Sequence, residues 1–240
     1  MKLYSQILVK ISCIVGLFGL GTCAPRELLL PANRMQNLQK ELNARVAAQQ
    51  RLRILFVGNS YSFGVPQALT KVVAANNRSV KTGHSTYGGW TLAQHAEHEG
   101  TLEKIRGGKW DIVVIQEHSL IPAHPARKRN AMMFGPLRFL VKEARAHGAI
   151  PVLYQTWGRR DGNDQLREDS FKQMTARLRE GYHAAAKFAD GVIVIPVGDA
   201  WEREMIAGRG RELFIDDGSH PSAAGDAITA ATFYHALFEP

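Results

Sequence analysis

From residue 53 onward, short runs of β-branched and aliphatic residues alternate with longer segments of helical period. Repeated strand and helix segments are typical of a parallel sheet covered by helices on both faces. We predict strands at 54–57, 80–85, 112–116, 151–155 and 192–197. We predict helices at 66–75, 92–105, 130–147, 169–189 and 223–238. This pattern indicates a flavodoxin-like α/β fold, in which ligands bind outside the carboxyl ends of the strands.

The start of the chain has the layout of a signal peptide. Lys2 precedes an apolar run at 11–20 and small residues at 21–24. Lys10 interrupts a longer apolar run, so a permanent transmembrane anchor is the less favoured interpretation. We therefore expect an exported protein, either periplasmic or secreted. The residues before Cys23 resemble a bacterial lipobox, so a lipoprotein attached to the membrane through Cys23 stays an alternative.

The chain is expected to have three parts. They are a signal peptide at 1–24, a polar helical segment at 25–52 and a single folded domain at 53–240. The middle segment is either a surface helix or a loosely attached linker. The two cysteines, Cys13 and Cys23, both lie in the leader, which excludes a disulfide framework and a thiol nucleophile from the domain. The stability of the domain must therefore come from a packed core.

The net charge of +8 raises the question of nucleic-acid binding. The basic residues are dispersed, however, with local clusters only at 127–129 and 159–160 and no interleaved aromatic residues. We expect no nucleic-acid partner. His95 and His98 share a helical face, but no third metal ligand is evident. Phosphate-binding and dinucleotide-binding glycine loops are also missing from the sequence, so neither a metal nor a cofactor is predicted.

Two separate segments suggest nucleophilic catalysis. The first predicted strand breaks at Gly58 and Asn59, which places Ser60 at a strand-to-loop turn. A serine hydroxyl needs a base and oxyanion donors to become a nucleophile. Asp217 and His220 lie three residues apart before the last predicted helix, where a carboxylate can orient an imidazole toward a serine. Judged alone, the Ser60 segment fits a common turn or helix cap better than a catalytic site, and the Asp217–His220 segment fits a capped turn as well as a catalytic pair.

Taken together, these segments resemble the SGNH, or GDSL-like, hydrolase superfamily over residues 54–238. Residues 56–60 resemble its first block, with Asn59 in place of the usual aspartate, and residues 217–222 resemble its fifth block. The resemblance implies a three-layer flavodoxin-like fold with a parallel five-stranded sheet. It also implies that Ser60 is the nucleophile of a catalytic triad.

The second and third blocks concern the oxyanion hole. Residues 87–91 are similar to the second block, in which Gly89 would supply a backbone donor, with Gly88 as the alternative. The third block is usually Gly-x-Asn-Asp, but here Gln116 opens a Gln-Glu-His-Ser segment. A glutamine amide can donate the same hydrogen bond, and relatives that deacetylate sugars carry Gln-Gly-Glu there. The resemblance is strongest to a bacterial branch with a Gly-Asn-Ser first block and a Gln-Glu third block.

With the leader, the resemblance implies an exported serine esterase without cofactors that acts on carboxylic esters. O-acetylated or otherwise acylated glycans are the first expected substrate class, and small lipid or aryl esters are the second. Asp217 and His220 would activate Ser60, and the Ser60 amide, the Gly89 amide and the Gln116 side chain would hold the oxyanion.

Two further residues are candidate substrate contacts: Trp157, which would stack on a sugar ring, and Glu117. The alternatives are a glycan O-acyltransferase and a non-catalytic binding domain with the same fold.

Overall fold

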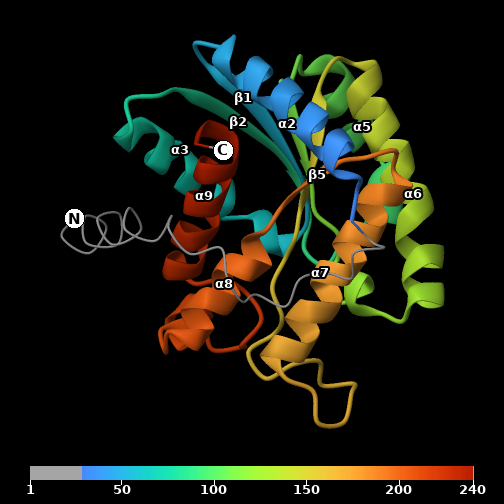
Figure 1. Cartoon of the computed structure of the whole chain (residues 1–240), viewed down its shortest axis with the longest axis vertical. Coiled ribbons are helices and arrows are strands. Elements are labelled where there is room, and N and C mark those ends of the chain that lie inside the picture. Colours follow the sequence, from blue (N-terminus) through green and yellow to red (C-terminus); the bar gives the residue numbers. More distant parts are fainter. Residues whose placement is uncertain (1–28, 240) are drawn as a thin grey trace.

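Five parallel strands form the centre of the molecule, and helices cover both faces of this sheet (Figure 1). The computed structural model describes residues 29–239, so the predicted leader with both cysteines lies outside the described residues. The strands are β1 (Leu52–Gly58), β2 (Val80–Thr86), β3 (Ile112–Ile115), β4 (Ile150–Tyr154) and β5 (Ile193–Ile195). Their order is β2-β1-β3-β4-β5, and every neighbouring pair is parallel. This order confirms the predicted flavodoxin-like sheet.

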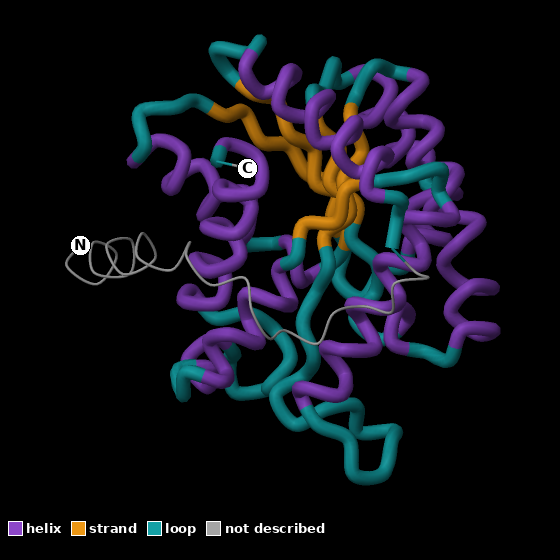
Figure 2. The backbone as a smooth tube through the Cα atoms, in the orientation of Figure 1, coloured by secondary structure: helices purple, strands orange, loops and turns teal. Residues whose placement is uncertain are grey.

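The helices divide between the two faces of the sheet, as Figure 2 shows. One core cluster contains the apolar sides of α2 (Ala32–Ala47), α3 (Val65–Ala75), α8 (Val197–Ile206) and α9 (Ala223–Phe238). The other contains those of α4 (Leu92–Glu97), α5 (Glu99–Gly107), α6 (Ala126–Ala146) and α7 (Phe171–Phe188). Along β1, Ile54 and Phe56 face the first cluster, and Leu55 and Val57 face the second. Both faces are buried, which explains the continuous apolar runs in the sequence.

Two helical predictions differ from the structure. The helix predicted at 92–105 is broken at His98, whose backbone is extended and whose Nδ1 accepts from the N–H of Thr101 at 3.1 Å. A side chain that caps a new helix start ends the preceding helix there. Helix α8 was not predicted, because its residues follow directly on the apolar run of β5 and Pro196.

The segment before β1 is a helix that packs on the domain. Leu42 and Val46 of α2 are buried in the first core cluster. Of the two interpretations of this segment, a surface helix is what the structure shows for Ala32–Ala47. Within residues 29–239, no helix has the length and apolar character needed to span a bilayer.

Candidate active site

The predicted site residues gather at the edge of the sheet where the strands end. Ser60 follows β1, residues 87–91 follow β2, and Gln116 follows β3. Residues 215–222 come from a distant part of the chain and lead into α9. Parallel strands share one carboxyl edge, so segments far apart in sequence meet there.

Ser60, His220 and Asp217 form one continuous hydrogen-bonded chain. The Oγ of Ser60 lies 2.8 Å from Nε2 of His220. The Nδ1 of the same ring lies 2.6 Å from Oδ2 of Asp217. When the carboxylate accepts the Nδ1 hydrogen, the lone pair on Nε2 faces the serine hydroxyl. The arrangement allows His220 to accept the Ser60 proton.

The loop at residues 215–222 holds Asp217 and His220 through its own backbone. The N–H of Ile215 donates to the carbonyl of His220 at 3.1 Å. Oδ1 of Asp217 accepts from the N–H groups of Ser219 at 2.8 Å and His220 at 2.9 Å. Burial raises the pKa of Asp217, but these N–H groups and the His220 ring outweigh burial and hold the pKa below its ordinary value. Asp217 is therefore ionised and oriented at neutral pH.

Three stacked aromatic rings connect this loop to the rest of the domain. Trp157 stacks on Tyr61 with ring centroids 4.8 Å apart and on Trp201 with centroids 3.7 Å apart. The Tyr61 hydroxyl lies 2.6 Å from Oγ of Ser219, and Nε1 of Trp157 donates to the Ser219 carbonyl at 3.1 Å. The stack therefore fixes the residue that lies directly before His220. Sequence reasoning missed Tyr61 and Ser219, whose only signal was their position beside Ser60 and His220.

The prediction that Trp157 contacts a sugar is wrong. Its side chain is fully buried, and Tyr61 and Trp201 occupy both faces of the indole. An indole covered on both faces has no surface left for a ligand ring. Trp157 instead supports the loop at residues 215–222, which we call the triad loop.

Asn59 stands where the superfamily's first block usually has aspartate. Both the oxygen and the nitrogen of its side-chain amide form hydrogen bonds. Oδ1 accepts from the N–H of Tyr61 at 3.2 Å, and Nδ2 donates to the carbonyl of Trp90 at 3.1 Å. An aspartate can accept the first bond but has no hydrogen for the second. Because Asn59 is buried, water would not replace that bond. Asn59 thus ties the Ser60 turn to the segment that carries Gly89.

Two backbone N–H groups near the Asn59–Trp90 hydrogen bond have no acceptor among the described residues. Within residues 29–239, neither the N–H of Ser60 nor that of Gly89 donates a hydrogen bond to the protein. Gly89 has a φ of +73°, and a Cβ at this position would meet no atom within 4 Å. A positive φ and open space suit a glycine that turns its N–H toward a ligand. Both groups stay candidates for the oxyanion hole, and the fallback residue Gly88 lies in the same exposed segment.

The Gln116 side chain turns its oxygen toward the Ser60 turn. Oε1 accepts from the N–H of Asn59 at 2.9 Å and from Oγ of Ser62 at 3.0 Å. Nε2 donates to the carbonyl of Glu117, and the side chain is buried. In this arrangement Gln116 braces the nucleophile turn. Its role as an oxyanion donor would need the amide to leave these partners, and that role stays a prediction.

Glu117 is not a substrate contact in the structure, because it is fully buried. Oε1 accepts from the N–H groups of Leu92 at 3.0 Å and His118 at 2.6 Å, and Oε2 has no partner among the described residues. Burial raises the pKa of Glu117 from 4.5 to about 7, although the two N–H groups oppose that shift. Glu117 links the end of β3 to the start of α4, directly after the Gly89 segment.

The histidine pair of α4 and α5 is occupied by internal hydrogen bonds. Nδ1 of His95 and Nδ1 of His98 each lie 3.1 Å from Oγ1 of Thr101. Burial lowers the pKa of His95 to about 4, so its neutral ring donates from Nε2 to the Gly58 carbonyl at 2.8 Å. In the described part of the chain, no cluster of three or more His, Cys, Asp or Glu residues could hold a metal ion.

Neither a protein-family model nor a curated protein matches the chain. Solved structures are similar to it. A protein of Slackia heliotrinireducens, provisionally assigned as an SGNH hydrolase, is 29% identical with a TM-score of 0.63, and the match covers 78% of this chain and 99% of that chain. A DUF4886 family protein from Bacteroides uniformis is 19% identical with a TM-score of 0.69, covering 79% and 84% of the two chains.

An acetyl xylan esterase from Geobacillus stearothermophilus is a further structural neighbour. It is 18% identical with a TM-score of 0.58, and the match covers 78% of this chain and 94% of that chain. These neighbours confirm the predicted α/β fold of the SGNH hydrolases. They support a hydrolase of that superfamily, whereas the branch stays a prediction.

Proposed function

We propose that this SGNH-fold protein is a serine esterase that hydrolyses carboxylic esters through an acyl-enzyme on Ser60. The observation that carries the proposal is the continuous chain from Ser60 through His220 to Asp217, with distances of 2.8 Å and 2.6 Å. A hydroxyl, a base and a group that orients the base are the parts that nucleophilic acyl transfer requires.

His220 removes the Ser60 proton while Oγ attacks the ester carbonyl. The carbonyl oxygen becomes negative and accepts hydrogen bonds from the free N–H groups of Ser60 and Gly89. The C–O bond to the alcohol then breaks, and His220 gives its proton to the leaving alcohol. Water, deprotonated by His220, releases the acyl group from Ser60 by the same steps.

Acetyl esters of glycans are the first proposed substrate class. The neighbour from Geobacillus stearothermophilus is named an acetyl xylan esterase, which is an analogy at the level of the fold. The exposed segment at Gly88 and Gly89 leaves the Ser60 side open to a large substrate. Export, on which access to extracellular glycans depends, stays a prediction from residues 1–24.

Replacing Ser60 with alanine tests the proposal. Ser60→Ala should reduce acetate release from phenyl acetate by about 10³-fold or more, because no nucleophile remains. Ser79→Ala, an exposed serine before β2, is the matched control and should keep full activity. A fluorophosphonate probe should label the wild type and not Ser60→Ala. Unchanged turnover in Ser60→Ala, or an unlabelled wild type, would overturn the proposal and favour a non-catalytic domain.

A further inference from the structure

Two consecutive arginines lie beside the triad, on the loop that joins β4 to α7. The N–H of Arg160 donates to the carbonyl of Gly218 at 2.7 Å. Its guanidinium packs on Gly218, because a Cβ placed there would come within 3.1 Å of Arg160 Cζ. Gly218 lies between Asp217 and Ser219 in the triad loop. The Arg160 guanidinium therefore lies directly against the loop that carries His220.

Arg159 brings a second positive charge to the residues around this loop. Its charge acts on Tyr61, whose hydroxyl is bonded to Ser219, and on His118. Burial lowers the pKa of His118, and the charges of Arg159 and His124 lower it further. Arg159 thus lies near Tyr61 and His118, on the side of the triad loop that Arg160 contacts.

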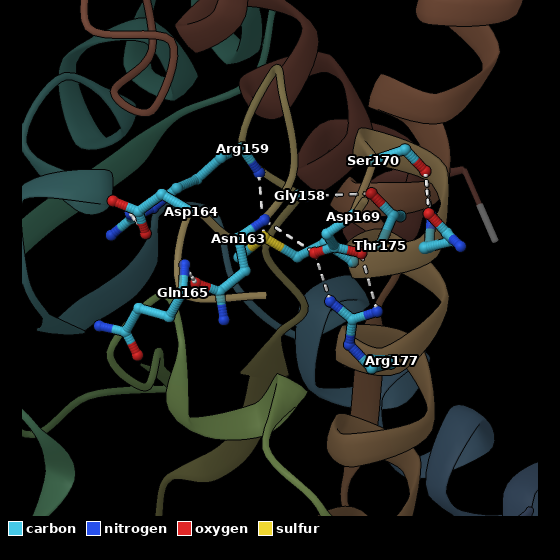
Figure 3. Close-up of polar contacts among 11 residues, drawn as sticks. Gly158, Arg159, Asn163, Asp164, Gln165, Asp169, Ser170, Thr175 and Arg177 are labelled. Atoms are coloured by element: carbon cyan, nitrogen blue, oxygen red, sulfur yellow. Dashed lines mark hydrogen bonds and ion pairs between the residues drawn. The ribbon is translucent and has the colours of Figure 1, made fainter. Parts of the chain in front are cut away.

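The carboxylates that accompany the two arginines are exposed and come from the same loop. Arg159 Nη1 lies 3.2 Å from Asp164, whose side chain is 76% exposed, and Arg160 Nε lies 3.2 Å from Asp161, which is 83% exposed. Figure 3 shows the Arg159 side chain extended toward Asp164. Exposed ion pairs of this kind contribute little free energy and exchange readily with another anion. Nε of Arg159 is buried without a partner among the described residues.

The loop that carries these arginines is itself anchored. Asp169 at its end accepts from Arg177 of α7 at 3.0 Å and 2.6 Å and from the N–H of Asn163 at 2.7 Å (Figure 3). The N–H of Gly158 at its start donates to Thr175 at 3.0 Å. Both ends of the loop are therefore held by α7, and the arginine backbone is positioned before any ligand binds.

The roles of His220 and Gly89 in the proposed reaction indicate which part of an ester would lie near these arginines. His220 must reach the leaving alcohol to protonate it, and the Gly89 N–H must reach the carbonyl oxygen. Arg160 packs on the loop that carries His220, whereas Gly89 lies on the segment that Asn59 contacts through Trp90. The alcohol portion of the substrate therefore lies on the arginine side of Ser60.

We propose that Arg159 and Arg160 bind a carboxylate on the alcohol portion of the ester, as in an O-acetylated uronic acid. The inference rests on the proposed esterase function and names its substrate class. The guanidinium fork matches a carboxylate with two parallel hydrogen bonds. The loop carboxylates engage Nη1 of Arg159 and Nε of Arg160.

A matched pair of substrates tests the inference. Acetate release is measured from O-acetylated galacturonic acid and from the same compound with its carboxylate converted to a methyl ester. The wild type should prefer the acid by about tenfold in kcat/KM, and the preference should shrink as salt rises to about 0.5 M. Arg159→Gln and Arg160→Gln should each reduce the ratio of the two kcat/KM values, and the double variant should bring the ratio to about one.

Arg167→Gln is the control within the same loop, because its side chain is 94% exposed and remote in sequence from the triad contacts. It should leave both rates and their ratio unchanged, and thermal unfolding should show that all variants are folded. A wild type without preference for the acid, or arginine variants that lower both rates equally, would overturn the inference. Ser60→Ala separates the two proposals, because acetate release by that variant from both compounds would refute the esterase itself.

Discussion

Ser60 lies between two differently organised groups of residues. The His220 side is the loop at 215–222, and the β3 side is formed by Gln116 and Glu117. On the His220 side, both carboxylate oxygens of Asp217 accept hydrogen bonds, and its pKa is lowered because N–H groups and the imidazole stabilise its charge. On the β3 side, Glu117 is buried with a pKa raised to about 7, and its Oε2 has no partner within residues 29–239. One carboxylate is thus organised to carry charge at neutral pH, and the other is placed where charge is costly. The hydrogen-bonded chain from Ser60 to Asp217 is continuous in the structure, whereas the proposed oxyanion side is lined by buried bracing residues.

The largest effect is expected on the His220 side. His220→Ala should lower kcat for an acetyl ester by about 10⁴-fold, because the Ser60 proton then has no acceptor. Asp217→Ala should cause a smaller loss, because Asp217 orients the ring and does not itself accept the proton. His235→Ala removes an exposed histidine paired with Glu239 and should keep full activity. Comparable kcat values for His220→Ala and His235→Ala would contradict the triad.

The raised pKa of Glu117 predicts a pH-dependent stability. Between 4.5 and about 7 the folded protein keeps a proton on Glu117 that the unfolded chain has released. This group therefore lowers the free energy of unfolding as pH rises through that window, by up to about 3 kcal/mol in total. Glu117→Gln should remove this contribution, so the stability of the variant relative to wild type should increase between about pH 4.5 and pH 7.5.

Urea unfolding at both ends of the window measures this difference, with the exposed Glu168→Gln as the control. A constant difference between wild type and Glu117→Gln across the window would show that Glu117 ionises normally in the folded protein.

The smallest expected effect is that of replacing Gln116. This replacement tests whether Gln116 braces the Ser60 turn or donates a hydrogen bond to the oxyanion. Gln116→Ala leaves the buried N–H of Asn59 without its acceptor, so the free energy of unfolding should fall by about 1–3 kcal/mol. As a bracing residue, Gln116 should affect kcat by less than the roughly hundredfold expected for a lost oxyanion donor. Urea unfolding and kcat are measured on the same variant. A loss in kcat of a hundredfold or more with unchanged stability would instead identify Gln116 as an oxyanion donor.

Local patterns account for what could be predicted. The strands β1, β3, β4 and β5 were located because both faces of the sheet are covered there, which leaves apolar runs in the sequence. Asp217 and His220 could be paired from sequence because they lie three positions apart in a tight loop. Ser60 could be added because it follows a strand whose carboxyl end lies at the ligand-binding edge.

Packing between distant segments decided the rest. Trp157, Gln116 and Glu117 were placed at the correct edge by sequence, but their side chains point into the protein. Trp157 is covered by Tyr61 and Trp201, and Glu117 is fixed by the N–H of Leu92. The sequence by itself determined the sheet, and it predicted the edge at which Ser60, His220 and Asp217 meet. Only the tertiary structure decided which neighbours of the triad are supports, because burial depends on contacts made across the chain and not on local spacing.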